Sequence, residues 1–535
     1  MKVVTAAQMA AIEQAADRSG VTLDTLMENA GLAVAQAARD DLGGVAGARV
    51  VILVGPGNNG ADGLVVARHL RRWGAEVACC LLTRRPEHDP KLDLAREYGV
   101  QILVSPDGDT LQRLLRRSRM VIDAILGTGR SRPLDGPVRD AMLTLQRIRP
   151  QPGHPELVEG PPLLLALDLP TGLNPDTGKT DPACPRFDTT LALGYPKIGL
   201  LRFPGVEHAG RLRVLDIGIP PGLPEEQSID VEMLTSQWVA SQLPPRNLDS
   251  HKGTYGHALV VAGSRHYVGA AWLASQASVR TGAGLTTLAS PESVYPIAAA
   301  KGVEAIHLPL PEDDSGRIAP SAVSVIRQSE RRFTAVLSGC GMGWSEGATE
   351  FLRLLLRETQ DKLAGLPLLI DADGLNNLSA IENWPSQVNG PLVLTPHPGE
   401  MSTLTGLPVA EIQADREGVA REWAGRWGAT FVLKGAHTVI ASPGEPVRIA
   451  PFANPGLATG GTGDVLSGVI VSLLAQGLPP SVAAAAGVYL HAAAGQSVTD
   501  RIGQTGLAAS DLLDSLPPTI AALHRATPDS AHLPS

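Results

Sequence analysis

The chain contains the stretch Asn454-Pro455-Gly456-Leu457-Ala458-Thr459-Gly460-Gly461-Thr462-Gly463-Asp464-Val465-Leu466, in which four glycines precede an apolar run with helical spacing. A glycine-rich turn that opens a helix aims unpaired N–H groups and the positive end of the helix dipole at one point, which favours an anion. Asp464 falls in the first turn of the expected helix. There it could take a proton from a hydroxyl that attacks a bound phosphate. A plain loop capped by an aspartate would have the same pattern, so other segments must decide.

Length and composition narrow the class of protein. The chain has 535 residues, too many for one hydrophobic core, so we expect at least two domains. Hydrophobic residues make up 44% and charged residues 19%, a balance typical of soluble globular proteins. The net charge of −9 and the lack of a long basic run argue against a nucleic-acid partner. No apolar run has the length of a membrane span, so we expect no membrane partner either.

The cysteines and the N-terminus indicate a compartment. The four cysteines show no metal-like spacing, and two of them are adjacent, which is poor placement for a disulfide: Cys79, Cys80, Cys184 and Cys340. Acidic residues interrupt the alanines near the N-terminus, unlike the apolar core of a signal peptide. We therefore expect a reducing, bacterial-type cytoplasm.

The first half opens with two expected helices over residues 1–39 and a buried-type strand over 49–54. The strand runs into Gly55-Pro56-Gly57-Asn58-Asn59-Gly60-Ala61-Asp62-Gly63, which we expect to be a loop, and then into a helix over 64–73. A strand, a glycine loop and a helix in this order form the phosphate-facing unit of a doubly wound sheet. The loop does not match G-x-G-x-x-G, so an ordinary dinucleotide fingerprint is not indicated.

Polar residues of this loop could contact a nucleotide. Asn58, Asn59 and Asp62 offer hydrogen bonds to ribose or amide groups. A tight turn with a capping side chain explains one of them but hardly all three.

Three more strands, over 76–82, 120–126 and 163–167, alternate with helical segments and predict a parallel sheet with helices on both faces. Asp123 lies inside an apolar strand, and a buried carboxylate needs a cation or hydrogen bonds. Asp168 ends the next strand. The carboxyl ends of parallel strands meet at one edge, where open α/β sheets bind ligands. A structural role is as plausible as a functional one for either aspartate alone, but several polar segments at one edge favour a site.

Five segments of the first half together resemble the NAD(P)HX epimerase family over nearly all of residues 1–220, and they lie at 26–31, 58–63, 121–129, 168–172 and 196–199. The resemblance implies a Rossmann-like fold that binds a hydrated nicotinamide nucleotide. It assigns substrate contacts to Asn58, Asn59, Gly60, Ala61, Asp62, Gly127, Thr128, Gly129, Arg130, Ser131, Arg132, Pro133 and Asp168.

The same resemblance implies a potassium ion held by Asn59, Asp123 and Thr171, and oxygen ligands of this kind suit a hard cation. The sequence departs from the family at Ala61, where glycine is usual, and at Thr171, where serine is usual. Neither change removes an oxygen ligand. Asp168 is the candidate for catalytic proton transfer, and Lys197 is a weaker one.

Composition suggests the domain boundaries. Residues 218–226 are proline-rich, so we expect a first domain over 1–222, a linker over 223–232 and a second domain over 233–524. Residues 525–535 are expected to be a disordered tail. Residues 151–162 resemble an inserted surface loop.

The second half repeats the α/β pattern. We expect one helix over 269–281 and strands over 258–262, 285–288, 335–337, 368–370, 392–394 and 430–433. Polar motifs close three of these strands, at 371–374, 395–400 and 434–438. Lys434 is placed where nucleotide phosphates could lie. His397, between two prolines, could equally be a functional contact or a hydrogen-bonded structural residue.

These motifs resemble the ADP-dependent NAD(P)HX dehydratase, a member of the ribokinase-like superfamily, over residues 230–520. The resemblance implies an ADP site at Lys434, Gly435, Ala436, His437, Thr438, Asn454, Gly456, Thr459, Gly460, Gly461, Thr462 and Gly463. It implies a hydrate site at Ala270, Gly343, His397 and Asp464, with Asp464 as the catalytic base. It also implies Mg²⁺, and the choice of ADP over ATP rests on the resemblance alone.

Together the halves predict an enzyme that epimerises R and S NAD(P)HX and dehydrates the S epimer at the expense of ADP, giving AMP and phosphate. We expect NAD(P)HX and ADP as its ligands and a homo-oligomer as its state. Two alternatives remain open. The second half could be a small-molecule kinase that shares the anion-binding loop, and the first half could be a nucleotide-binding module without catalysis.

Overall fold

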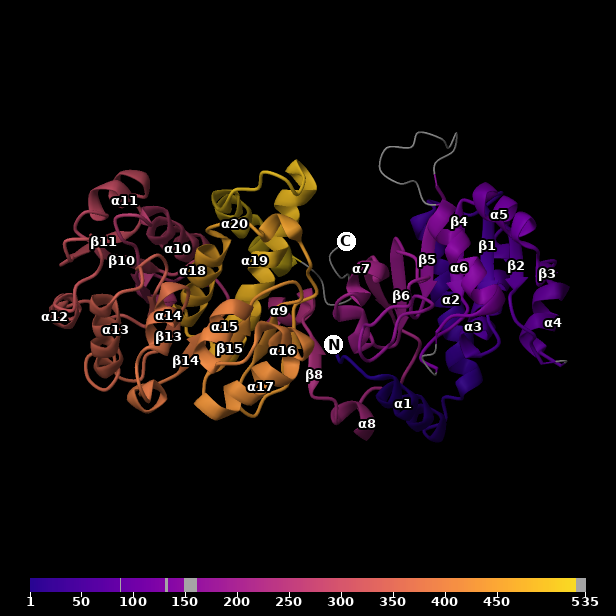
Figure 1. Ribbon diagram of the computed structural model, residues 1–535, viewed down its shortest axis with the longest axis horizontal. Coiled ribbons are helices and arrows are strands. Elements are labelled where there is room, and N and C mark those ends of the chain that lie inside the picture. The colour runs from indigo at the N-terminus through magenta and orange to yellow at the C-terminus, as the bar shows by residue number, and fades with distance from the viewer. Residues whose placement is uncertain (87, 130–132, 149–160, 526–535) are drawn as a thin grey trace. The chain divides into compact units, whose positions relative to one another are not determined.

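The computed structural model describes residues 1–86, 88–129, 133–148 and 161–525 (Figure 1). The chain forms two compact units, which divide between Val231 and Glu232. The stretch predicted to be a linker is not featureless, because it contains helix α8 (Pro224–Gln227) and the start of strand β8 (Val231–Met233). The predicted tail and the predicted inserted loop lie almost wholly outside the described residues. Within the described residues, every helix is too short or too polar to span a lipid bilayer.

The first unit is built on a seven-stranded parallel sheet in the order β3-β2-β1-β4-β5-β6-β7. Its strands are β1 (Arg49–Val54), β2 (Glu76–Leu81), β3 (Gln101–Val104), β4 (Met120–Ala124), β5 (Leu163–Leu167), β6 (Thr189–Leu193) and β7 (Arg211–Leu215). Its helices are α1 (Ala6–Arg18), α2 (Leu23–Asp41), α3 (Asn58–Arg72), α4 (Pro90–Glu97), α5 (Gly108–Arg117), α6 (Gly136–Ile148) and α7 (Gly205–Ala209). This is the doubly wound architecture that the sequence predicts.

Alternation along β1 explains why both faces of this sheet are covered. Val50, Ile52 and Val54 pack into a core with α1, α2 and α3. Val51 and Leu53 point to the other face and pack with α5 and α6. Since successive side chains of a strand point to opposite faces, an uninterrupted apolar strand predicts a sheet buried on both sides.

One predicted boundary is wrong: α3 begins at Asn58, whereas the sequence predicts a loop up to Gly63 and a helix from Leu64. The glycines that suggest a loop allow close packing inside the helix. A Cβ on Gly60 would lie 2.1 Å from the carbonyl oxygen of Gly55. A Cβ on Gly63 would lie 2.6 Å from the Cβ of Ala124. The first two turns of α3 therefore pack tightly against β4 and against the turn that follows β1.

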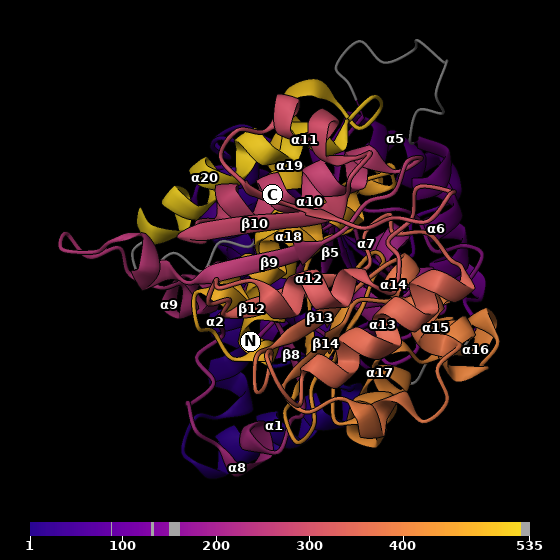
Figure 2. The same ribbon diagram turned by 90° about the vertical axis from the view of Figure 1, so that its left-hand side faces the viewer.

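The second unit is built on a ten-stranded sheet in the order β11-β10-β9-β12-β13-β14-β15-β16-β17-β8, in which β10 and β9 lie side by side (Figure 2). Its further strands are β9 (His257–Val261), β10 (Leu285–Pro291), β11 (Ile306–Leu310), β12 (Ala335–Ser338), β13 (Leu368–Ile370), β14 (Leu392–Leu394), β15 (Thr430–Leu433), β16 (Val439–Ala441) and β17 (Val447–Ile449). The strands from β11 to β15 are parallel, and β16 is antiparallel to both of its neighbours.

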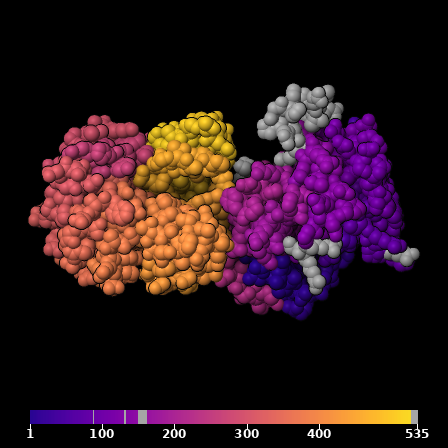
Figure 3. All heavy atoms as spheres, in the orientation of Figure 1, coloured from indigo at the N-terminus to yellow at the C-terminus, as the bar shows by residue number. Residues whose placement is uncertain are grey.

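Helices cover both faces of this sheet as well. One face carries α9 (Ser236–Gln242), α10 (Val268–Thr281), α11 (Tyr295–Lys301), α18 (Thr462–Ala475), α19 (Pro480–Ile502) and α20 (Ala509–Arg525). The other carries α12 (Ala322–Gln328), α13 (Glu346–Glu358), α14 (Asp373–Ser379), α15 (Pro398–Thr405), α16 (Val409–Ala414) and α17 (Arg416–Trp427). The yellow atoms of the last helices pack closely on the orange atoms that precede them (Figure 3).

The four cysteines are free, buried thiols, which agrees with the prediction of no disulfide. The compartment stays a prediction of the sequence.

Candidate active sites

The first unit has a cavity of about 710 Å³ at the carboxyl ends of its central strands. Much of the apolar part of its wall comes from α1 and α2. The structure places seven of the sequence-predicted substrate residues on its wall: Asn58, Asn59, Asp62, Gly127, Thr128, Gly129 and Asp168. Gly60 and Ala61 are buried in the first turn of α3 and do not line the cavity, and neither does Pro133. Arg130, Ser131 and Arg132 lie outside the described residues.

Asp168 and Lys197 form a buried ion pair on the cavity wall. The Lys197 ammonium is 1% exposed and also donates a hydrogen bond to the carbonyl oxygen of Leu193 at 3.2 Å. The Leu193 amide donates to Asp168 Oδ1 at 3.0 Å, and Lys197 contacts the same oxygen. Asp168 adopts φ 66°, a left-handed conformation that Asp tolerates better than most residues. The pair and the Leu193 amide together fix Oδ1 of Asp168 on the cavity wall.

Asp123, Thr171 and Asn59 meet beside this cavity. The carboxylate of Asp123 is fully buried and accepts hydrogen bonds of 2.8 Å from both the amide and the hydroxyl of Thr171. Burial raises the pKa of Asp123 to about 6, and the hydrogen bonds from Thr171 oppose that shift. The amide nitrogen of Asn59 donates to the Leu126 carbonyl oxygen at 3.1 Å, so its own oxygen remains for another partner. A cation among these oxygens would offset the cost of burying Asp123.

The predicted anion loop of the second unit has the expected geometry. Helix α18 begins at Thr462, so Asp464 lies in its first turn as predicted. Gly461 adopts φ 94°, which favours glycine, and the Thr462 hydroxyl donates to the carbonyl oxygens of Leu457 and Thr459, both at 2.9 Å. A Cβ on Gly460 would meet nothing within 4 Å. The loop at Gly460 is therefore open just before α18, and the start of a helix favours an anion.

Burial raises the pKa of Asp464 to about 6, and the nearby Asp371 carboxylate adds to the shift. A hydrogen bond from the Cys340 thiol and the charge of Lys434 act in the opposite direction. Asp464 is therefore mostly ionised at neutral pH and yet basic enough to accept a proton from a hydroxyl.

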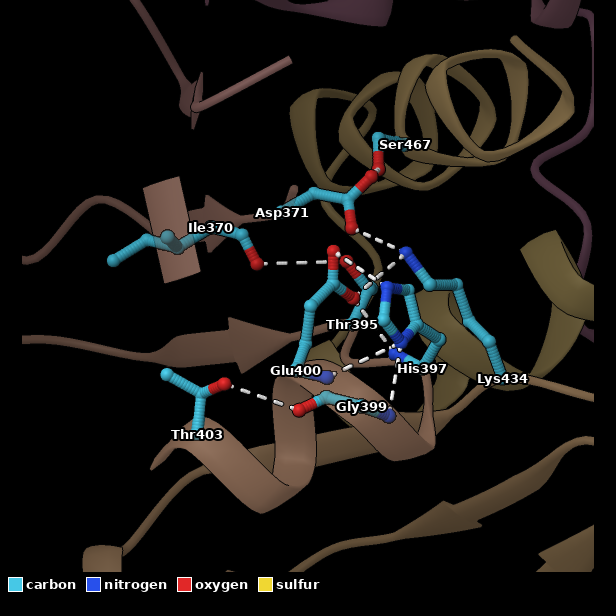
Figure 4. A network of polar contacts seen from close by, with 9 residues as sticks. All are labelled: Ile370, Asp371, Thr395, His397, Gly399, Glu400, Thr403, Lys434 and Ser467. Carbon is cyan, nitrogen blue, oxygen red and sulfur yellow. Dashed lines mark hydrogen bonds and ion pairs between the residues drawn. The ribbon is translucent and has the colours of Figure 1, made fainter. Parts of the chain in front are cut away.

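Lys434 is the centre of a network of polar contacts (Figure 4). Its ammonium lies 2.6 Å from Asp371 Oδ1 and 3.5 Å from Glu400 Oε2, while the hydroxyl of Ser467 donates to Asp371 Oδ2 at 2.7 Å. Burial lowers the pKa of Lys434, but the two carboxylates outweigh it and raise that pKa to about 12. The lysine nitrogen lies 3.8 Å from the position of a Cβ on Gly463. A permanent positive charge thus stands next to the anion loop.

His397 has a structural role that the sequence left open. Its Nδ1 accepts hydrogen bonds from the amides of Gly399 at 3.0 Å and Glu400 at 3.1 Å, so it caps α15. The Glu400 carboxylate accepts from the His397 amide at 2.7 Å and completes a capping box. Its Nε2 lies 3.4 Å from Glu400 Oε1, but the side chain is 57% exposed, so capping and ligand contact are compatible.

Ala270 and Gly343, the other predicted hydrate contacts, lie near one another. A Cβ on Gly341 would lie 2.8 Å from the Cβ of Ala270. The Gly343 amide donates to Asp373 Oδ2 at 2.9 Å. This turn follows β12, whereas Asp464 comes from α18.

Several predicted ADP residues are engaged within the protein. Asn454 caps the turn at Gly456 and donates to Thr499 Oγ1 at 2.8 Å. His437 is buried, its Nδ1 contacts the Ala450 carbonyl oxygen at 3.1 Å, and burial lowers its pKa to about 4. These side chains therefore shape the loops. Gly435, Ala436, Thr438 and Thr459 lie in the same two loops and are at least partly exposed.

Sequence reasoning missed four residues of these sites: Glu13, Cys340, Glu400 and Ser467. Ser467 carries a usable signal, because it lies three residues after Asp464 on one helix face. Glu13 has none, because its cavity forms only when α1 packs against the sheet.

Comparison with known proteins identifies the family of this chain. A family model described as NAD(P)H-hydrate dehydratase matches residues 258–518, and one described as YjeF-related protein N-terminus matches residues 23–199. The bifunctional NAD(P)H-hydrate repair enzyme of Moorella thermoacetica is 40% identical over 97% of this chain and 96% of its own length. The enzyme of that name from Thermofilum pendens is 38% identical over 98% and 97%.

A solved structure is also similar. The ADP/ATP-dependent NAD(P)H-hydrate dehydratase of Bacillus subtilis, co-crystallised with ATP and Mg²⁺, is 34% identical over 55% of this chain and all of its own, with a TM-score of 0.48. Because the full-length relatives exceed 30% identity over almost the whole sequence, this chain belongs to the family of bifunctional NAD(P)H-hydrate repair enzymes.

Proposed function

We propose that the chain repairs hydrated nicotinamide nucleotides, with an ADP-dependent dehydratase in the second unit and an epimerase in the first. The observation that supports the dehydratase best is the placement of Asp464 and Lys434 at one anion loop. For the epimerase it is the cavity that holds Asp168 and Lys197.

The dehydratase step follows from the residues around the anion loop. The substrate carries a hydroxyl at C6 of its tetrahydronicotinamide ring, and hydroxide is a poor leaving group. Asp464 takes the proton of this hydroxyl while the oxygen attacks the β-phosphate of ADP, which releases AMP. The first-turn amides of α18 and the Lys434 ammonium stabilise the charge on the transferred group. The ring nitrogen lone pair then expels phosphate and forms an N1=C6 iminium. Loss of a proton from C5 to the released phosphate restores NADH or NADPH.

Two metal ions belong to this proposal. A magnesium ion bound to the nucleotide supplies positive charge at its phosphates. In the first unit, Asn59, Asp123 and Thr171 would hold a potassium ion, as their oxygen donors suggest. Among the described residues there is no group of three His, Cys, Asp or Glu side chains that could hold a metal ion.

For the epimerase, we infer reversible loss of the C6 oxygen or reversible ring opening. The side chain that exchanges the proton is Asp168, with one oxygen fixed by Lys197. If Asp168→Ala left the exchange of R and S hydrates at the wild-type rate, this role would be wrong.

The function is tested with racemic NADHX, Mg²⁺ and K⁺, and with either ADP or ATP, by following the return of reduced-nicotinamide absorbance. We expect full recovery, because the first unit supplies S hydrate from R faster than spontaneous exchange. If the absorbance recovers only to the fraction of NADHX that was S hydrate at the start, the first unit is a binding module and not an epimerase. A phosphorylated product from ATP without recovery would make the second unit a kinase. Replacing K⁺ by tetramethylammonium should slow only the exchange phase.

The pH dependence of dehydration provides a second prediction. Because Asp464 must be ionised to accept a proton and its pKa is about 6, kcat/KM for S hydrate should fall below pH 6 and be level just above it. The slope should approach one decade per pH unit. The measurement uses pure S hydrate, so that epimerisation does not contribute. A level profile down to pH 5 would contradict the role of Asp464.

A further inference from the structure

Among the described residues, the cavity of the first unit is lined by more acidic groups than cations. Its wall contains the carboxyl groups of Glu13, Asp62 and Asp168, and one ammonium, that of Lys197. Lys197 is committed to Asp168 and to a backbone carbonyl. Two carboxyl groups therefore share a partly desolvated space without a cation of their own among the described residues.

Asp62 is the less compensated of the two. It is 8% exposed and lines the cavity, yet among the described residues its carboxyl group accepts no hydrogen bond and forms no ion pair. Asp123 provides the contrast, since it is equally buried but accepts three hydrogen bonds. A buried carboxylate without a partner is costly, and a neutral carboxylic acid avoids that cost.

The other cations near Asp62 have partners. Arg85 pairs with Asp89 at 2.5 Å. Lys91 pairs with Asp24 at 2.8 Å and with Glu28, which also pairs with Arg68. None of these three cations belongs to the cavity wall.

The charges that face Asp62 favour its protonated form. Burial raises its pKa most, and the carboxyl groups of Asp168 and Glu13 raise it further. Lys197 and Lys91 act in the opposite direction but are outweighed. Glu13 experiences a similar, smaller effect, since burial raises its pKa as well. The surroundings of Asp62 thus favour its neutral form, on the same cavity wall as the ion pair of Asp168 with Lys197.

We propose that Asp62, in its protonated form, is the general acid of the epimerisation and that Asp168 is the matching base. The inference deepens the proposed epimerase function and rests on it. Asp62 lies in α3, at the start of its second turn, whereas Asp168 directly follows β5. Because Lys197 and Leu193 both contact Oδ1 of Asp168, its Oδ2 is left to exchange a proton.

The step balances without another reactant. Asp62 gives its proton to the C6 hydroxyl, the C6–O bond breaks, and water leaves with the bonding electrons. The ring nitrogen lone pair forms the N1=C6 bond of an iminium. Water then adds to the opposite face of C6, and Asp168 takes the proton that this water releases. Asp62 is now the carboxylate and Asp168 is the acid. This is the state that the reverse exchange requires. Proton transfer through water returns both groups to their first state.

Glu13 is a positioning residue in this scheme. It does not touch the reacting atoms but raises the pKa of Asp62 through its charge. Glu13→Gln should therefore move the alkaline limb of the exchange rate to lower pH, with little change in the maximal rate. A merely structural role of Glu13 would change the rate at every pH alike.

The test is exchange of pure R hydrate to S hydrate by the full-length chain without nucleotide, followed by chromatography. Asp62→Asn should lower the exchange rate by about 10²–10⁴-fold, the usual effect of a general acid. Its affinity for the hydrate, measured by calorimetry, should stay within about threefold of wild type, because the amide keeps the shape of the carboxyl group. Asp109→Asn, an exposed acid in the first turn of α5, is the matched control and should exchange at the wild-type rate.

Each result of this test either supports or overturns the general-acid role of Asp62. Exchange by Asp62→Asn at the wild-type rate, or loss of hydrate binding with it, would overturn the general-acid role. If this variant fails to fold, the wild-type pH profile decides, because exchange must fall at high pH as Asp62 loses its proton. A rate that keeps rising with pH would overturn the inference. Absence of exchange in wild type would instead refute the proposed epimerase function, so the two failures are distinguishable.

Discussion

Asp464→Asn is expected to abolish dehydration of S hydrate in the full-length chain while ADP still binds. The amide has the size of the carboxylate but cannot accept the hydroxyl proton, and loss of a general base costs about 10²–10⁴-fold in rate. The first-turn amides and Lys434, which we propose as the groups that bind the phosphates, are unchanged by the substitution. The measurement is kcat with ADP and pure S hydrate, together with the dissociation constant of ADP from calorimetry.

The control for this prediction is Asp514→Asn on α20. Its side chain is 81% exposed and pairs with Arg280 at the surface, a contact worth little to stability. This variant should dehydrate at the wild-type rate. Dehydration by Asp464→Asn above one-tenth of the wild-type rate, or a weakening of ADP binding as large as the rate loss, would sink the assignment of Asp464 as the base.

The second large effect is on stability. Lys434→Met removes the cation that compensates Asp371, a carboxylate that is 1% exposed, and leaves Glu400 without it as well. Breaking a buried ion pair from one side costs about 3–5 kcal/mol, because the remaining charge is uncompensated. We expect the free energy of unfolding of the second unit to fall by about that amount, as measured by urea denaturation with tryptophan fluorescence.

The double variant Lys434→Met, Asp371→Asn isolates the cause. With the carboxylate neutralised, the loss should shrink to below about half of the single-variant value, as expected for contacting residues in a double-mutant cycle. Arg280→Met removes a cation from the exposed pair with Asp514 and should cost under about 1 kcal/mol. A cost of that small size for Lys434→Met would show that Asp371 is stabilised without the lysine.

Sequence patterns predicted the strands well because they are short, apolar and buried on both faces. Leu368–Ile370 and Leu392–Leu394 were expected within one residue of their observed ends. The start of α3 was missed because Asn58, Gly60 and Gly63 are poor helix formers in isolation. Tertiary packing overrides that preference, since the glycines let the helix approach β4 and the β1 turn.

Site residues that local sequence positions could be predicted, whereas those that only the tertiary fold brings together could not. Asp464 was predictable because its loop and its helix are contiguous, so local geometry places it. The contact of Asp371 with Lys434 spans 63 residues, and only the order of strands β13, β14 and β15 brings the two together. The pairing of Lys197 with Asp168 likewise depends on neighbouring strands. Motifs at strand ends showed which edge was polar, but not which groups would compensate each other.

Strand β8, at the junction of the two units, protects an edge of the second sheet against pairing with other chains. It lies at the edge of the ten-stranded sheet and covers β17, and the Leu234 amide donates to the Ile449 carbonyl oxygen at 2.9 Å. Without it, β17 would present free backbone groups to any other extended chain. If β8 were replaced by a flexible spacer, or if the chain were cut within it, β17 would become an exposed edge strand. Such an edge can pair with a strand of another molecule.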